Sequence, residues 1–362
     1  MIVSNRSITT PDHHPVCYAH GEMRRSSRRL QPGWRWLGLC MIAVMGAMGC
    51  EQGGGAMWGQ PQRSEPEAKA AREQDEPQLA ALAQAVQENP QSATAYLQLG
   101  DAQQQRGDLE AAAKAFARAV KLDPFNYDTT FKLAKANHKL RRYPEAIRTY
   151  KHAVELEPGR VEPRLNLGIC YHQAGRLDEA IEAYQDVIQL DPANPATYTN
   201  LGAAYDAQGK HFEAIRAFSE SLERDPNQPM VLVNLGISLM NQRRWANAKA
   251  ALARATEFDG GLVLAHERLG YCCMRMRDYE QSQSSYERAI ELDPENAGAY
   301  AGLGAVLMAR YVQQPGQAEL RKQAVEQWRR SLTLKPNQPK IRQLLEAYDA
   351  QSPRPATLME SR

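Results

Sequence analysis

Apolar residues along the middle of the chain recur at intervals of three or four, which is the spacing of one face of an α-helix. Residues 196–207 show this pattern first, and residues 212–224 show it again after a break at Gln208-Gly209-Lys210. Gly209 suits the end of a helix and Pro226 prevents the second helix from continuing. The segment 195–228 is therefore predicted to form two amphipathic helices joined by a tight turn.

This helical hairpin recurs at a fixed interval along the chain. A Leu-Gly or Leu-Ala pair marks the same place in each first helix. The pairs are Leu99-Gly100, Leu133-Ala134, Leu167-Gly168, Leu201-Gly202, Leu235-Gly236, Leu269-Gly270 and Leu303-Gly304. The proline that closes the second helix recurs as Pro90, Pro124, Pro158, Pro192, Pro226 and Pro294, with Gly260 in phase. Both sets recur every 34 residues. A fixed period of 34 residues is typical of a stacked repeat array, in which each unit buries its apolar stripe against its neighbours.

The period of 34 with its Leu-Gly, Ala, aromatic and Pro positions resembles the tetratricopeptide repeat (TPR) family. The resemblance implies an all-α fold, an α-solenoid or right-handed superhelix of seven helix-turn-helix hairpins with half-repeat caps at both ends. The expected solenoid spans 77–349, and the remaining chain is divided into 1–49, 50–76 and 350–362. Within the solenoid we expect a half unit 77–92, repeats 93–126, 127–160, 161–194, 195–228, 229–262, 263–296 and 297–338, and a cap 339–349.

The last repeat is eight residues longer than the others, and the extra residues around 311–318 are expected to separate its two helices. The cap helix is expected to turn Arg342, Gln343 and Glu346 toward water, as the open end of a repeat array requires. Residues 350–362 are expected to be disordered.

The N-terminal segment 1–49 indicates export. A basic cluster at 24–29 precedes an apolar run from Trp36 to Gly49, which is short for a membrane span and suits a secretory signal peptide. Met23 is a possible true start. The run ends in Ala47-Met48-Gly49-Cys50, which resembles a bacterial lipobox, so Cys50 is the predicted lipidation site. Ordinary signal cleavage with release, and retention as an uncleaved anchor, are the alternatives.

Composition bears on the segment before the solenoid and on the class of partner. Residues 50–76 hold few large apolar side chains, so we expect a flexible tether there. Without residues 1–49, which hold 6 basic and 2 acidic side chains, the formal net charge changes from +2 to −2. A near-neutral chain provides no argument for nucleic acid as a partner.

Cysteine and histidine are metal-binding or catalytic in many proteins, but here the cysteines are explained by packing and the histidines by a surface position. Cys170 and Cys272 fall on a small buried repeat position, and His138 and His172 have no Cys, Asp or Glu at ligand spacing. No phosphate loop or nucleophile elbow occurs, and the repeats leave no space for a catalytic domain. We therefore expect no enzyme activity, cofactor, metal or small-molecule substrate.

In TPR proteins the first helices line a concave groove, and the resemblance implies ligand contacts from fixed places in each repeat. The sixth place carries Asn166, Asn200 and Asn234 in three successive repeats. A primary amide has donors and an acceptor for peptide backbone, so an extended peptide is the expected ligand. This arrangement resembles the asparagine ladder in the repeat arm of nucleocytoplasmic sugar transferases, although Asn is also the family's common choice at this place.

Two sets of side chains flank this asparagine ladder. Lys132, Lys135 and Lys139 make a basic patch that suits an acidic ligand residue, with a solvated helix face as the alternative. Met240, Met274 and Met308 recur at the repeat period near Tyr271 and suit an apolar shelf, with packing between neighbouring first helices as the alternative. The pattern of the chaperone-tail clamp of cytosolic members is matched only at Asn166.

The predicted function is a non-catalytic adaptor or scaffold of the bacterial cell envelope that binds a protein segment in its groove. It is expected to face the periplasm from a lipid anchor, in the outer membrane by preference, and to contact membrane only through that anchor. One alternative is an assembly subunit that oligomerises through convex or end surfaces. Another is a docking arm for a separate glycosyltransferase.

Overall fold

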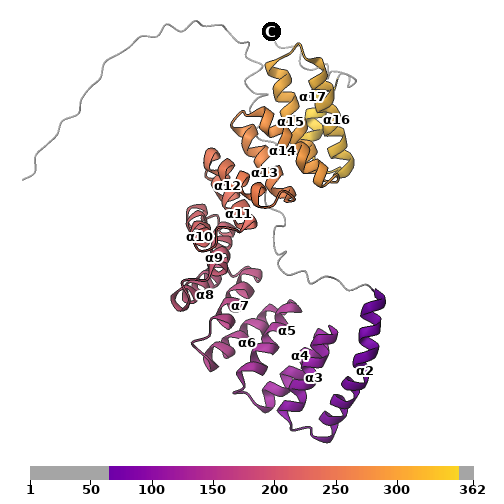
Figure 1. Cartoon of the computed structure of the whole chain (residues 1–362), viewed down its shortest axis with the longest axis vertical. Helices are drawn as coiled ribbons and strands as arrows, with labels where there is room; N and C mark the ends of the chain where they lie inside the picture. The colour runs from indigo at the N-terminus through magenta and orange to yellow at the C-terminus, as the bar shows by residue number, and fades with distance from the viewer. Residues whose placement is uncertain (1–64, 350–362) are drawn as a thin grey trace, which may run out of the picture. The chain divides into compact units, whose positions relative to one another are not determined.

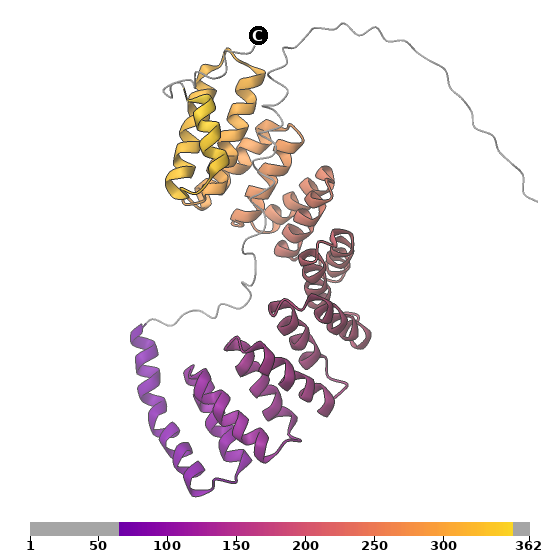
Figure 2. The same ribbon diagram turned by 180° about the vertical axis from the view of Figure 1, so that it is seen from behind.

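The computed structural model describes residues 65–349. The predicted signal peptide, Cys50, the first part of the tether and the C-terminal tail lie outside these residues. The described part consists of helices, without a strand (Figures 1 and 2). In chain order they are α2 (Glu65–Glu88), α3 (Ala93–Arg106), α4 (Leu109–Leu122), α5 (Tyr127–Lys139), α6 (Tyr143–Leu156), α7 (Val161–Gln173), α8 (Leu177–Leu190), α9 (Pro195–Ala207), α10 (His211–Arg224), α11 (Pro229–Asn241), α12 (Trp245–Phe258), α13 (Val263–Arg275), α14 (Tyr279–Leu292), α15 (Ala297–Gln313), α16 (Ala318–Leu334) and α17 (Pro339–Tyr348).

The helices from α3 to α16 pair as antiparallel hairpins, and α17 follows them as a single helix. The first helix of each pair begins at residue 93, 127, 161, 195, 229, 263 or 297, where the corresponding predicted repeat begins. Each helix packs chiefly against the helix before it and the helix after it in the chain. The array is therefore held together by contacts between neighbours, as expected of a solenoid.

The Leu-Gly pair and the aromatic residue of the second helix form the core of a hairpin. A Cβ built at Gly202 would be 2.7 Å from the ring of Phe218, which is buried. The same relation joins Gly168 to Tyr184 and Gly100 to Phe116. The predicted role of the glycine, which is to let the next helix approach, is confirmed.

A buried polar contact that the sequence analysis missed joins some hairpins to the next helix. Ser331 Oγ donates to the carbonyl of Ala297 at 2.8 Å, while Gln338 Nε2 donates to the Oγ and carbonyl of Ser331 at 2.9 and 3.0 Å. Ser221 and Gln228 repeat the arrangement earlier in the array. One serine and one glutamine thus connect three helices.

Two elements differ from the sequence prediction. The helix expected from Pro77 begins at Glu65, so it overlaps the predicted tether and holds Pro77 inside it. The extra residues of the last repeat do not form a separate loop. They lengthen the helices, since α15 and α16 each have 17 residues, against 13 in α13 and 14 in α14. Residues 314–317 alone connect the two long helices. Helical continuation satisfies the backbone hydrogen bonds that a loop would expose.

The C-terminal end is closed as predicted. Helix α17 buries Ile341 and Leu344 against the array, while Arg342, Gln343 and Glu346 are exposed. Among residues 65–349, no helix has the length and apolar composition to cross a membrane.

Candidate functional site

The first helices lie closer to one another than the second helices do. Beyond sequential neighbours, the helices with the most extensive contacts are all first helices: α7 with α9, α9 with α11, α11 with α13, and α13 with α15. A stack in which one set of helices converges is concave on that side. The concave wall of this part of the array is therefore lined by first helices.

The asparagine ladder lies on this wall, where Asn166, Asn200 and Asn234 take equivalent places on α7, α9 and α11 and are partly exposed. Asn166 Nδ2 donates to the carbonyl of Glu162 in its own helix at 2.9 Å. The side-chain amides of Asn200 and Asn234 make no hydrogen bond to any described residue. Two of the three amides thus have all of their donors and acceptors available for a ligand.

An aliphatic row that the sequence analysis did not single out runs beside the ladder. Ile169, Ala203 and Ile237 occupy the ninth place of the same three repeats, three residues after each asparagine, and are half-buried. Residues three apart on a helix are neighbours on its surface. Amide groups and aliphatic surface therefore alternate on α7, α9 and α11, and the regular recurrence at the ninth place is the signal that would have identified the row.

The carboxylate of Asp206 has internal partners at the edge of this surface. His211 Nδ1 lies 2.7 Å from Asp206 Oδ1, and Ser238 Oγ donates to the same oxygen at 2.8 Å. The serine contacts the carboxylate and not the imidazole, so the trio lacks the nucleophile-to-base contact of a hydrolytic triad. Its effect is to tie α9 to α10 and α11.

The basic patch is partly neutralised. Lys132 Nζ lies 2.9 Å from Asp101 on α3 and 3.0 Å from Asp128 on its own helix. Partial burial alone would lower the pKa of Lys132, but the hydrogen bonds to these two carboxylates raise it above the ordinary lysine value. Lys135 lies 3.9 Å from Glu162, with its ammonium 5.2 Å from the centre of the Phe131 ring. Lys139 is exposed and has no ion pair within the described residues.

The predicted apolar shelf is mostly buried. Met240 and Met274 are 8% and 9% exposed, and Met308 is fully buried. Tyr271 is half-buried, with its ring 6.2 Å from that of Trp245 and its hydroxyl accepting from Arg275 Nη1 at 3.2 Å. The packing alternative therefore describes the three methionines, which are not available as a ligand surface.

The histidines and cysteines are packed among other side chains. His138 Nε2 lies 2.8 Å from Gln173 Oε1, and burial lowers the pKa of His172. Cys170, Cys272 and Cys273 are fully buried, and burial raises their pKa values to about 11, 12 and 11. No group of three or more potential metal ligands occurs within the described residues.

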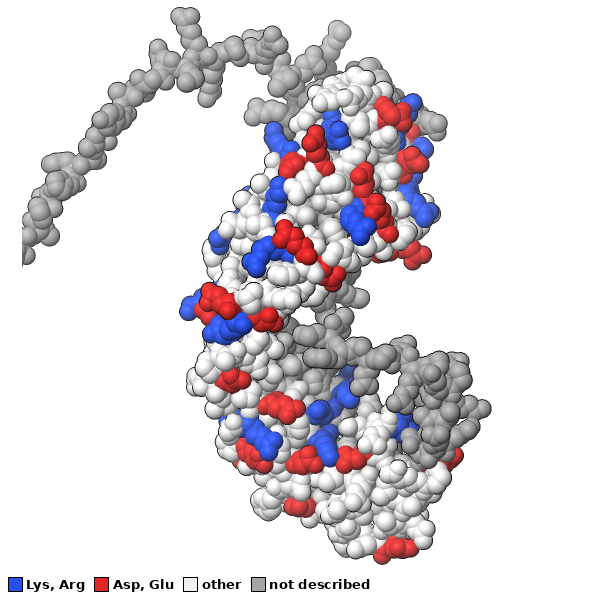
Figure 3. All heavy atoms as spheres, in the orientation of Figure 1, with Lys and Arg blue, Asp and Glu red and all other residues white. Residues whose placement is uncertain are grey.

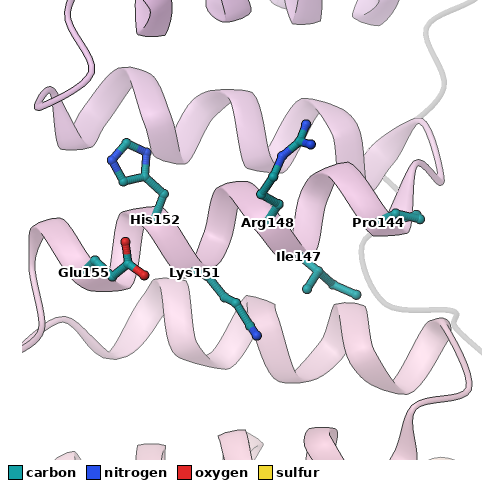
Figure 4. A pocket seen from close by; sticks show the side chains of 6 residues that line it. All are labelled: Pro144, Ile147, Arg148, Lys151, His152 and Glu155. Carbon is teal, nitrogen blue, oxygen red and sulfur yellow. The ribbon is translucent and has the colours of Figure 1, made fainter.

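A recess lies on the surface of α6 and has a volume of about 380 Å³. It is lined by Pro144, Ile147, Arg148, Lys151, His152 and Glu155 (Figure 4). All six come from one helix at spacings of one, three or four residues, so polar groups from different elements do not converge there. The wall formed by α7, α9 and α11 is the stronger candidate because three helices contribute equivalent groups to it.

Family comparison agrees with this geometry. Models described as tetratricopeptide repeat match residues 66–127, 128–160, 149–182, 195–228 and 263–296, and one described as TPR repeat matches 170–209. The chain belongs to the tetratricopeptide repeat family. TPR units generally serve protein–protein interaction, so the family supports an interaction scaffold.

Solved structures resemble this TPR chain in fold. The C-terminal part of a TPR repeat-containing protein from Cytophaga hutchinsonii has a TM-score of 0.57 at 16% identity, over 68% of this chain and 98% of that one. The APC/C hetero-tetramer Cut9-Hcn1 has a TM-score of 0.50 at 16% identity, over 75% and 52%. YrrB, a TPR protein with an unusual peptide-binding site, has a TM-score of 0.47 at 20% identity, over 54% and 96%. No curated protein matches the chain significantly. At these identities the likeness concerns the fold alone.

Proposed function

We propose that this TPR chain is a non-catalytic adaptor that holds an extended segment of another protein along α7, α9 and α11. The observation that carries the proposal is the pairing of the asparagine ladder with the aliphatic row on three successive first helices. An extended peptide presents backbone amides and side chains in alternation. The amides of Asn166, Asn200 and Asn234 are suited to the backbone, and the surface around Ile169 and Ile237 to apolar side chains.

The charge of the basic patch indicates which end of the site meets an acidic residue of the bound segment. Since Lys132 already has two carboxylate partners and Lys135 lies 3.9 Å from Glu162, Lys139 is the lysine of the basic patch left to meet an acidic ligand residue. Hydrogen bonds to backbone impose little sequence preference, so the specificity of such a site comes from its flanks. We therefore infer a ligand with apolar residues over α9 and α11 and an acidic residue toward α5.

The cellular setting is part of the proposal. Cys50, which lies outside the described residues, follows an apolar run in the pattern of a lipobox. A lipid-anchored protein facing the periplasm fits this pattern, with the outer membrane favoured because Glu51 and not Asp follows the cysteine. Metabolic labelling with palmitate tests the anchor: the label should be lost in Cys50→Ser, and a label unchanged by that substitution would remove the anchor from the proposal.

The groove is tested with peptides selected from a random display library against the full chain. Asn166→Ala, Asn200→Ala and Asn234→Ala together should weaken the selected peptides by roughly 10- to 1000-fold, because each amide hydrogen bond contributes about 0.5–1.5 kcal/mol. The matched control replaces three exposed asparagines outside the groove: Asn89, Asn227 and Asn247. If both triple variants bind the peptides as the wild type does, the groove hypothesis fails. Sedimentation of the wild type then tests the alternative of an assembly subunit.

A further inference from the structure

The two sets of turns in the array carry opposite charge. The six turns within hairpins from residue 107 to 278 contain seven Lys or Arg and two Asp. The six connections between hairpins from residue 123 to 296 contain seven Asp or Glu and one Arg. Both signs of charge lie side by side on the face drawn in Figure 3, so that face as a whole carries no single sign.

Helix topology places each set at its own edge. The two helices of a hairpin are antiparallel, and successive first helices α7, α9, α11 and α13 contact one another. All turns within hairpins therefore lie along one edge of the stack, and all connections between hairpins lie along the other. We call the former the basic edge; its cations are Arg141, Arg142, Arg176, Lys210, Arg243, Arg244 and Arg277.

The acidic connections have a structural explanation within the fold. Asp191, Asp225, Asp259 and Asp293 each accept a hydrogen bond from the backbone N–H two residues later, at 2.9–3.2 Å. This is the local turn that aspartate favours at such positions. The aspartates are thus accounted for by chain geometry.

The cations of the basic edge break two local rules instead. Arg141, Arg243 and Arg277 have φ of 57°, 55° and 65°, in the left-handed region that glycine occupies in equivalent turns, as at Gly175 and Gly209. For a residue other than glycine this conformation is unfavourable.

The second broken rule concerns the N-cap residues, which directly precede the second helices. Arg142, Arg176, Lys210 and Arg244 are the N-cap residues of α6, α8, α10 and α12, and none makes a side-chain capping bond. Ser, Thr, Asp or Asn is preferred there, and the helix dipole disfavours a cation at an N-terminus. The C-terminus of the preceding first helix favours cations, so the dipoles of the two helices oppose each other at these turns.

Most of these cations are available to a partner. Arg142 is paired with Glu110 and Arg176 with Glu179, each at 2.6 Å. The other five, namely Arg141, Lys210, Arg243, Arg244 and Arg277, are exposed and have no ion pair within residues 65–349. These exposed and unpaired cations occupy backbone positions that are unfavourable for them, and no ion pair in the described part offsets this. They therefore indicate binding to a partner.

Exposed apolar side chains on the same edge narrow the kind of partner. Phe212, two residues after Lys210, is 67% exposed, and Met276, next to Arg277, is 42% exposed. Cations interleaved with exposed apolar side chains are typical of surfaces that enter the headgroup region of a membrane. A soluble polyanion would need the charges alone and would leave Phe212 and Met276 without a role.

We propose that the basic edge binds an anionic phospholipid surface. Phe212 and Met276 then enter the interfacial layer, and the unpaired cations meet the phosphate groups. This contact is separate from the groove on α7, α9 and α11, and it departs from the earlier expectation that membrane contact runs through an acyl anchor only. A membrane bound along this edge leaves the concave wall of first helices to one side and open.

The test uses the full chain with Cys50→Ser throughout, so that no acyl chain contributes, and measures partitioning into vesicles. Vesicles of phosphatidylglycerol mixed with phosphatidylcholine are compared with phosphatidylcholine alone. The ratio of the two removes any contribution of the apolar run 36–49, and the basic cluster 24–29 is common to every variant compared. Arg141→Gly, Arg243→Gly and Arg277→Gly together should lower this ratio by about 100-fold, given the usual contribution of one basic residue near an anionic surface. Because glycine favours these turns, the unfolding midpoint of this glycine triple should not fall.

A matched control removes the same charge elsewhere. Lys114→Gln, Lys121→Gln and Arg148→Gln replace exposed cations on α4 and α6 and should leave the ratio nearly unchanged. Phe212→Ser should lower partitioning into both kinds of vesicle by about tenfold. The proposal is overturned if the control lowers the ratio as much as the glycine triple does. It is also overturned if the wild type does not prefer anionic vesicles. Binding to heparin, a soluble polyanion, is measured beside this: a wild type that binds heparin through these arginines but does not prefer anionic vesicles would assign the edge to a soluble partner.

Discussion

The ring of Tyr184 occupies the space where a side chain at residue 168 would lie. A Cβ built on Gly168 would be 2.5 Å from Cε1 and 2.8 Å from Cδ1 of that ring, and Tyr184 itself is fully buried. The two residues lie on α7 and α8, the two helices of one hairpin. Their contact fixes how closely these helices approach.

Replacement of this glycine should therefore destabilise the array. Gly168→Ala is expected to lower the free energy of unfolding by about 1–3 kcal/mol, because the buried ring must move to admit one methyl group. Urea denaturation followed by circular dichroism measures the change. Gly159→Ala is the control, since nothing lies within 4 Å of a Cβ at that position. Equal midpoints for the two variants would contradict the packing argument.

The glutamine contact at the end of the array should be needed to hold its last helix. Gln338 is 4% exposed, and its amide donates to the Oγ and carbonyl of Ser331. Gln338→Ala should cost about 1–3 kcal/mol and speed amide hydrogen exchange in α17. Gln343→Ala, on the exposed face of the same helix, should change neither measurement. Slow exchange retained in the Gln338 variant would show that the other contacts of α17, such as the bond from Arg321 Nε to the carbonyl of Tyr348, hold it without the glutamine.

The ion pair between Lys249 and Asp278 should make stability depend on acid pH. Their atoms Nζ and Oδ2 lie 2.8 Å apart, and the hydrogen bond from Lys249 lowers the pKa of Asp278 below the ordinary aspartate value. Because the folded pKa lies below the unfolded one, this stabilisation is present above about pH 4 and is lost as the pH falls through the folded pKa.

Asp278→Asn tests this pair without removing the helix cap, because an asparagine oxygen also accepts the N–H of Gln281. Urea midpoints at pH 7, 5 and 3 should fall less steeply in the variant than in the wild type. Glu155→Gln, which removes an exposed carboxylate that has no ion pair in the described part, should follow the wild type. Parallel curves for wild type and Asp278→Asn would mean that the pair contributes nothing.

The buried thiols should be inert in the folded protein. A thiol pKa of about 11, as for Cys170 and Cys273, leaves roughly a thousandth of the groups as thiolate at pH 8, and the fold also blocks access. Alkylation followed by peptide mass spectrometry should find both residues unlabelled until urea unfolds the chain. Labelling of Cys170 in buffer as fast as in urea would show that α7 opens readily.

Much of this fold is predictable because each position of the repeat occurs in seven units, so the residue type that a position requires is visible within one sequence. Leu201, Gly202 and Phe218 have counterparts at the same places in other repeats, so their roles in the core follow from the pattern. The start of α2 was missed because it lies outside the periodic region, where a polar segment gives no repeat signal.

The sequence predicts where the candidate site residues lie, but not how exposed they are or which partners they have. The period places the asparagine ladder on the first helices, but it does not show that Met240 turns into the stack or that Asp101, from the preceding repeat, reaches Lys132. Both depend on contacts between side chains of different helices. A pattern along one chain specifies which face a residue is on, and packing determines how much of that face remains open.

In the described part of the chain, the extensive contacts between helices run within a hairpin or between adjacent hairpins, so whole repeats are units that a deletion can remove. Excision of residues 161–194 would join Arg160 to Pro195 at the same phase of the repeat and present α9 to the surface of α6 that α7 now covers. Such a deletion removes Asn166 and Ile169 together and shortens the asparagine ladder by one step. Under the proposed function, the length of ligand is thus adjustable by whole units, without redesign of any single helix.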